Sequence, residues 1–305
     1  MLLNLNILLN LQSEKAEFMK NITKICACLF VLSGLFLASC EHKSKIVPSN
    51  NVVCFDSIQT LQTYCLNNDT TQPCCNINIL FYYPDSTDKH MIQSLQSLFI
   101  EKMFGGTFAG ETPKQAVDEY VKQYIHVFQN IENQKDTAYL DEENQYVDET
   151  GFLYYIWLKN KILFNDNGYV SFTVESLVYE GGAYASKTVF GYVVNTSTGK
   201  LLTEDQFAGK NYKKHLSEIL AQKLAEANKL KSPNDLEDLG YSSLDDIVPN
   251  GNFTLDGQGI TYYFNEGDIA GTSVGMLRVF IPYNELKVYL ADENSLIAAF
   301  SGSQK

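Results

Sequence analysis

Polar and apolar residues alternate in several stretches of this 305-residue chain, and each such stretch predicts a β-strand. Residues 76–83 form the first, and Pro84-Asp85-Ser86 predicts the turn that ends it. The same period of two returns after residue 151. It predicts strands over residues 152–164, 169–179, 186–195, 253–255, 259–264 and 276–281.

Apolar residues at helical spacing predict three helices among these strands. The first covers residues 91–104, and the second starts at Thr112-Pro113, an N-cap followed by proline at the first helical position. The third covers residues 212–230, and a short helical turn is expected from Pro282 to about Leu290. Helices between groups of antiparallel strands indicate an α+β fold, with antiparallel sheets, packed helices and two closely associated subdomains.

Short polar segments with glycine separate the predicted strands. Asn165-Asp166-Asn167-Gly168 is a strong hairpin signal, and it lacks the distal bidentate acid of an EF-hand calcium loop. Gly181-Gly182, residues 196–200 and Asp256-Gly257 predict further turns.

The front of the chain has the three parts of a secretory signal peptide. A basic segment at 19–24 precedes an uncharged apolar run at 25–37, which is too short for a permanent membrane span of roughly 20 apolar residues. The ending Leu37-Ala38-Ser39-Cys40 resembles the bacterial lipobox, so Cys40 is the predicted lipidation site and the lipid would anchor the protein to a membrane. An ordinary signal peptide is the alternative.

Two neighbouring segments complete this prediction. Residues 1–18 precede a complete signal peptide, so the true start is expected at Met19. Residues 40–52 are polar and weakly patterned and are interpreted as a tether. Because the tether carries no acidic cluster, the expected location is the cell envelope, at the periplasm-facing side of the outer membrane.

Four of the seven cysteines remain once the signal peptide and Cys40 are set aside. An even number in an oxidising compartment favours disulfides among Cys54, Cys65, Cys74 and Cys75, with zinc or free thiols as alternatives. Adjacent Cys74 and Cys75 are poorly placed to bridge each other. The open pairings are therefore 54–74 with 65–75, or 54–75 with 65–74.

The chain is acidic, with 23 basic and 36 acidic residues and a formal charge of −13. Residues 1–40 hold three lysines and two glutamates, so the remainder carries a formal charge of −14. Such a charge repels nucleic acid and anionic lipid surfaces, and it would steer a cationic partner toward the protein. Solubility alone is the simpler explanation.

Few residues suggest catalysis. The predicted helices hold His90, His126 and His215 as solvated or capping residues, and no nucleophile elbow, zincin or phosphate-loop motif occurs. Acidic pairs such as Glu142-Glu143 and Asp245-Asp246 fall in predicted loops. We therefore expect no enzymatic activity, no cofactor and no metal, with a carboxylate-dependent glycan-active enzyme as the alternative.

A series of motifs after residue 168 resembles a known module. They are Tyr179-Glu180-Gly181-Gly182-Ala183-Tyr184, residues 195–203 (NTSTGKLLT), residues 259–265 (GITYYFN) and residues 281–286 (IPYNEL). In this order they resemble the RsiV/PdaC-like family of extracytoplasmic domains of unknown function. Residues from about 76 to 139 are similar to the companion domain that usually precedes that module.

This resemblance implies an extracytoplasmic binding module in a bacterial lipoprotein. Members include a lysozyme receptor and a companion of a peptidoglycan deacetylase, so the expected ligand is peptidoglycan, another glycan or a cationic protein such as lysozyme. A structural or assembly partner of another envelope protein is a further alternative. The candidate ligand-binding residues are Tyr184, Glu266, Asp268 and Tyr283. The implied division is 1–18, signal peptide 19–39, tether 40–52, N-terminal subdomain 53–150, C-terminal domain 151–292 and tail 293–305.

Overall fold

The computed structural model describes residues 52–85, 89–135, 153–180, 184–208 and 212–286, which all belong to one compact unit. The signal peptide, nearly all of the tether with Cys40, the Gly181-Gly182 turn and the tail lie outside these ranges. A six-stranded sheet with the order β1-β2-β3-β4-β5-β6 and a three-stranded sheet with the order β7-β8-β9 confirm the α+β class. None of the described helices combines the length and apolarity needed to span a membrane.

The larger sheet begins with a long antiparallel hairpin. Its strands β1 (Cys54–Cys65) and β2 (Cys74–Asp85) pair along their whole length, and Cys65 and Cys74 at the closed end form a disulfide. This bridge occurs in one of the two open pairings, 54–75 with 65–74, and excludes the other. The second bridge of that pairing does not form: Cys54 lies opposite Asp85 and Cys75 opposite Tyr64, at the two ends of the hairpin.

Strand geometry explains why Cys54 and Cys75 remain free thiols. About ten residues of strand separate them, or roughly 33 Å at about 3.3 Å per residue. A disulfide requires Cα atoms within about 7 Å. The thiol of Cys75 is fully buried, whereas Cys54 is exposed.

Removal of the disulfide with Cys65→Ser and Cys74→Ser is expected to destabilise the protein by about 2–3 kcal/mol, because the bridge closes a short loop in the unfolded chain. Urea unfolding would measure this change. Cys54→Ser, which removes an exposed free thiol, is the matched control and should leave the midpoint unchanged. Equal midpoints for all three proteins would contradict the prediction.

Two helices connect β2 to the next strand. α2 (Lys89–Phe104) and α3 (Pro113–Lys135) follow β2, and the chain then returns as β3 (Leu153–Asp166), which pairs with β2 in parallel. A parallel pair needs such a long crossover, so the larger sheet is mixed rather than purely antiparallel as predicted. It also spans residue 150, so the predicted subdomain boundary does not separate the two sheets.

The rest of the larger sheet is an antiparallel meander. β4 (Tyr169–Tyr179) follows β3 through a turn with positive φ at Asn167 and Gly168, as the hairpin signal predicts. β5 (Ser186–Asn195) and the short β6 (Lys200–Leu201) complete it.

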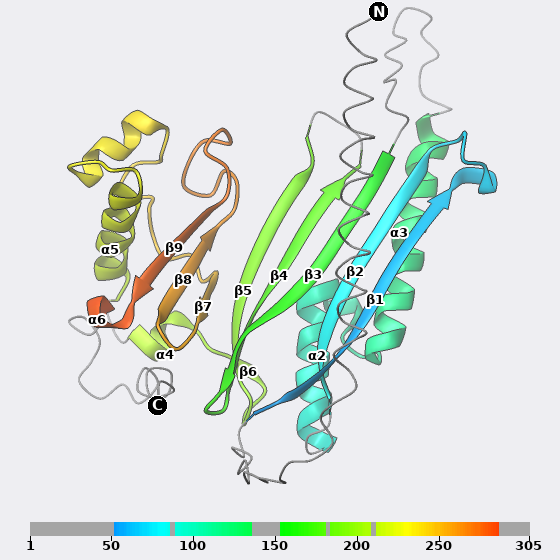
Figure 1. Cartoon of the computed structure of the whole chain (residues 1–305), viewed down its shortest axis with the longest axis horizontal. Helices are drawn as coiled ribbons and strands as arrows, with labels where there is room; N and C mark the ends of the chain where they lie inside the picture. The colour runs from blue at the N-terminus through cyan, green and yellow to red at the C-terminus, as the bar shows by residue number, and fades with distance from the viewer. Residues whose placement is uncertain (1–51, 86–88, 136–152, 181–183, 209–211, 287–305) are drawn as a thin grey trace, which may run out of the picture. The chain divides into compact units, whose positions relative to one another are not determined.

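α2 and α3 cover one face of this sheet (Figure 1). Every second strand residue points toward them, because side chains alternate between the faces of a strand. Phe172 at the centre of β4 stacks on Phe99 of α2, with ring centroids 4.0 Å apart. The fully buried members of this core include Cys75, Ile77, Ile79, Phe81, Ile100 and Val194.

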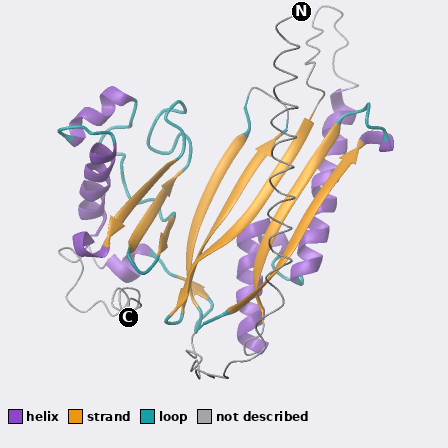
Figure 2. Ribbon diagram, viewed as in Figure 1, coloured by secondary structure: helices purple, strands orange, loops and turns teal. Residues whose placement is uncertain are grey.

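The second subdomain surrounds the smaller sheet, whose strands are β7 (Phe253–Leu255), β8 (Gly259–Phe264) and β9 (Leu277–Pro282). Its helices, shown in purple in Figure 2, are α4 (Glu204–Ala208), α5 (Tyr212–Ala227) and α6 (Tyr283–Leu286), with the 3-10 segment η3 (Pro233–Leu239). The core of this subdomain includes Phe207, Leu216, Leu220, Leu236, Ile260, Tyr262, Phe264 and Ile281.

The second subdomain packs against β4 and β5 on the face that the helices leave free. Gly191 permits this close approach, since a Cβ there would lie 2.7 Å from the carbonyl oxygen of Phe253. Two asparagines then bind the β5 backbone. Asn252 accepts from Gly191 N–H at 2.6 Å and donates to the Val189 carbonyl at 2.9 Å, and Asn265 accepts from Val189 N–H at 2.8 Å.

Candidate binding surface

Within the described ranges, no element covers one part of the second face of the larger sheet. The second subdomain covers Ser171 and Thr173 of β4, which are buried, and the uncovered part begins at Glu175. We call this part the open face. Its members come from five neighbouring strands and are Gln59, Leu61, Asn78, Leu80, Tyr155, Trp157, Lys159, Glu175, Leu177, Tyr179 and Lys187.

An aromatic group forms one part of the open face. Trp157 of β3 is the only tryptophan of the chain, and its side chain is 53% exposed. The Tyr155 ring lies 5.7 Å from it and 5.6 Å from the ring of Tyr179. On the outermost strand, Leu61 is 75% exposed. Exposed apolar side chains gathered at one place are typical of an interaction site.

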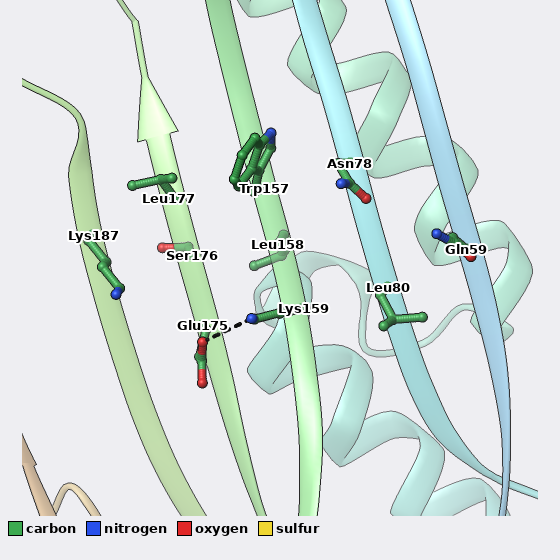
Figure 3. Close-up of a pocket in the computed structure, with 10 residues that line it drawn as sticks. All are labelled: Gln59, Asn78, Leu80, Trp157, Leu158, Lys159, Glu175, Ser176, Leu177 and Lys187. Atoms are coloured by element: carbon green, nitrogen blue, oxygen red, sulfur yellow. Dashed lines mark ion pairs between the residues drawn. The ribbon is translucent and has the colours of Figure 1, made fainter. Parts of the chain in front are cut away.

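A hollow of about 440 Å³ lies beside this aromatic group (Figure 3). Trp157 and Leu177 provide apolar walls, and Gln59 and Asn78 provide amide groups. In Figure 3 these side chains stand on the side of the sheet away from the translucent helices. Apolar walls with a few polar groups are the usual composition of a small-molecule site.

Charged groups occupy the other side of the hollow. The Glu175 carboxylate lies 3.3 Å from Lys159 Nζ and 3.6 Å from Arg278 Nη2, and its side chain is 20% exposed. The Arg278 guanidinium also lies 5.6 Å from the ring centre of Tyr263. Lys187 enters from β5, opposite Leu177. Two cations therefore pair with one carboxylate, and a third cation, Lys187, lines the same hollow.

The register of the sheet explains why these residues meet. Asn78, Trp157, Leu177 and Lys187 are consecutive partners across β2, β3, β4 and β5. The next row joins Gln59, Leu80, Lys159 and Glu175 in the same way. Residues far apart in the sequence thus form two adjacent rows on one face.

The four candidate residues from the sequence lie elsewhere. Tyr184 precedes β5 and is 90% exposed. Glu266 is exposed in the turn after β8, and Asp268 in the same turn accepts a hydrogen bond from Asn265 N–H at 2.7 Å. Tyr283 is buried, and its hydroxyl donates to the Asp256 carbonyl at 2.7 Å, a contact that holds α6 on the turn between β7 and β8. None of the four lines the hollow.

Asp268 does line a second hollow, of about 540 Å³, at the edge of β5. Asp246 and Asn265 are also part of its lining, and the exposed side chains of Phe190 and Val248 provide its apolar part. The carboxylates of Asp246 and Asp268 accept hydrogen bonds from Ser243 and Asn265, so both have a local structural role.

One carboxylate is buried within the second subdomain. Glu204 opens α4 and accepts hydrogen bonds from the Tyr212 hydroxyl at 3.1 Å and from Gly251 N–H at 2.9 Å. Burial and this contact with Glu204 raise the pKa of Tyr212 to about 12, so the phenol keeps its proton at neutral pH. The group links α4, α5 and the loop before β7, which is a structural role.

The other reactive groups are dispersed. Burial raises the pKa of the Cys75 thiol to about 11, so little thiolate forms at neutral pH. His126 is exposed on α3, and His215 lies 3.8 Å from Glu218. In the described ranges, no three side chains of histidine, cysteine, aspartate or glutamate gather as a metal site would require.

Comparison with known proteins relates the chain to a family without an assigned activity. The sequence model described as "Protein of unknown function (DUF3298)" matches residues 201–284. A solved structure of a DUF3298 family member from Bacteroides fragilis is 31% identical over 84% of this chain and 100% of its own, with a TM-score of 0.75.

A second solved structure, a DUF3298 family protein from Pseudomonas aeruginosa PAO1, is 16% identical with a TM-score of 0.54. It covers 80% of this chain and 96% of its own, and at this identity it supports the fold alone. No curated protein matches the chain.

Proposed function

The chain belongs to the DUF3298 family, and because that family has no assigned activity, we propose from the geometry that it binds a glycan on the open face without acting on it. In this proposal the protein is an envelope lipoprotein, anchored through Cys40 and similar in role to the RsiV/PdaC-like modules. The observation that carries the proposal is the exposed indole of Trp157 beside a hollow lined by amides.

Sugar rings have the chemistry that this surface would accept. Their C–H faces are apolar and stack on flat aromatic rings, and Trp157 with Tyr155 presents such rings on a rigid strand. Their hydroxyl groups exchange hydrogen bonds with amides, which Gln59 and Asn78 supply. Tryptophan and tyrosine also hold most of the binding energy in many interfaces.

Binding is favoured over hydrolysis by the charges in the hollow. Glycosidases use two carboxyl groups about 5–10 Å apart, one on each side of the scissile bond. Among the described residues, Glu175 is the one carboxylate that lines this hollow, and two cations neutralise it. Among the described residues, the hollow therefore offers one carboxylate, already ion-paired, where a glycosidase needs two.

Trp157→Ala is expected to weaken binding of chitotetraose, a neutral tetramer of N-acetylglucosamine, by about 10- to 100-fold, because the stacking surface is lost. Titration calorimetry on the full chain in mild detergent would measure the affinity. Tyr184→Ala removes an aromatic side chain that is more exposed than Trp157 and lies outside the hollow, and it is the matched control.

Three outcomes are informative. A loss for Trp157→Ala with no loss for Tyr184→Ala supports the open face. Equal affinity of wild type and Trp157→Ala, with unchanged thermal unfolding, would show that the open face does not bind the glycan. Lysozyme retained by both proteins would instead indicate a partner attracted by the acidic charge of the chain.

A further inference from the structure

The charge of the open face is opposite to that of the whole chain. The chain carries a formal charge of −13, yet Lys159 and Arg278 pair with the single carboxylate of Glu175, and Lys187 lines the same hollow. This group therefore holds a formal charge of +2. A local surplus of positive charge on a strongly acidic protein is not explained by solubility, which the remaining acidic surface already provides.

Glu175 cannot neutralise both of its cations. Its two oxygens are directed to Lys159 and Arg278, one to each, so the ion-pair geometry of this carboxylate is already filled. Within the described ranges Lys187 has no ion-pair partner, and it is exposed at the rim of the hollow. Its ammonium group is therefore available to a ligand.

Both lysines are within reach of a sugar stacked on Trp157. Lys187 is two strands away in the same row, or roughly 10 Å at about 4.8 Å per strand. Lys159 is two residues further along β3, or about 7 Å. A sugar ring spans roughly half of the distance between Trp157 and Lys187. The lysine side chain covers the rest, because its four-carbon stem extends the ammonium group several ångströms from the backbone.

We infer that the glycan bound on the open face is acidic, with a sugar carboxylate that pairs with Lys187 while the ring stacks on Trp157. This inference rests on the proposed function and adds the chemical class of the ligand. Among envelope glycans, alternating N-acetylglucosamine and N-acetylmuramic acid carries such a carboxylate on every second ring, as a lactyl ether. A neutral strand of the same rings lacks it.

The test compares two tetrasaccharides of equal length on the full chain in mild detergent. One alternates N-acetylglucosamine with N-acetylmuramic acid, without peptide stems, and the other is neutral chitotetraose. We expect the acidic tetrasaccharide to bind at least 10-fold more tightly at low salt, and we expect this preference to shrink as salt is added. Equal affinities would overturn the inference and leave glycan binding intact.

Variants assign the preference to one residue. Lys187→Gln should reduce affinity for the acidic tetrasaccharide about 5- to 10-fold and leave that for chitotetraose unchanged, whereas Lys187→Arg should restore the preference. Lys200→Gln, an exposed lysine on β6 outside the hollow, is the matched control. An acid preference that survives Lys187→Gln would overturn the inference. Absence of binding by either tetrasaccharide would overturn it together with the proposed function.

Discussion

Replacement of Asn252 by alanine is expected to lower the free energy of unfolding by about 2–4 kcal/mol, because the buried Gly191 N–H would lose its partner at about 1–3 kcal/mol and the Val189 carbonyl would retain only the longer bond from Asn265, at 3.3 Å. The Asn252 side chain is 8% exposed. Its amide accepts from Gly191 N–H and donates to the Val189 carbonyl. Both groups face the second subdomain, where the alanine side chain could replace neither of these two hydrogen bonds.

Urea unfolding followed by tryptophan fluorescence and by circular dichroism would measure this change. Asn265→Ala is the matched control: its side chain also bonds Val189, but it is only partly buried, so water can replace it. We expect a smaller loss there, about 1 kcal/mol. An Asn252→Ala protein as stable as wild type would show that water reaches these backbone groups.

Phe172→Ala is expected to cost about 3–5 kcal/mol, the range found for large-to-small changes at buried phenylalanines. The ring is fully buried at the centre of β4 and stacks on Phe99. It also lies 5.2 Å from the ring of Tyr192. Its removal would leave a cavity between β4 and α2, since neither element can collapse without disturbing its own neighbours.

Phe190→Ala makes the same chemical change on β5, at the residue before Gly191, where the side chain is 44% exposed. We expect a change of less than about 1 kcal/mol there. Thermal or urea unfolding of both variants would test the difference. Equal losses would contradict the expectation that the cost comes from the burial of Phe172.

Most strands after residue 152 could be predicted from the sequence, because one side of each is buried. Their boundaries at 169–179, 186–195, 253–255 and 259–264 agree with the structure. Two strands were not predicted, the long β1 and the two-residue β6, and β1 is the instructive case. Its apolar residues Phe55, Ile58, Leu61 and Tyr64 recur every three positions, which does not follow the period of a strand, and pairing with β2 decides its conformation.

Strand pairing could not be predicted in the same way. Alternation states which residues face a core but not which strand lies alongside, so neither the parallel β2–β3 pair nor the distance between Cys54 and Cys75 was accessible. The side chains of Asn160 and Asn165 illustrate the same limit. They bond the backbone of Tyr82 and of Val53, contacts 78 and 112 residues apart in the sequence.

The open face shows why the sequence motifs placed the candidate ligand-binding residues mainly in loops instead of on the sheet. Tyr184, Glu266 and Asp268 lie in or next to the motifs that carry the family resemblance. Trp157, Lys159 and Glu175 instead occupy ordinary alternating positions of long strands. Whether such positions are accessible depends on how far the second subdomain extends over the sheet. The single tryptophan at a position facing away from the apolar side was the one signal available.

Asn252 and Asn265, which bind the backbone of β5, also affect whether two molecules of this protein can pair through that strand. A strand at the border of a sheet exposes unpaired backbone groups, and a strand from another molecule can pair with them and start aggregation. At Val189 and Gly191 these groups are already occupied by Asn252 and Asn265. The junction between the subdomains therefore blocks intermolecular strand addition along this part of β5.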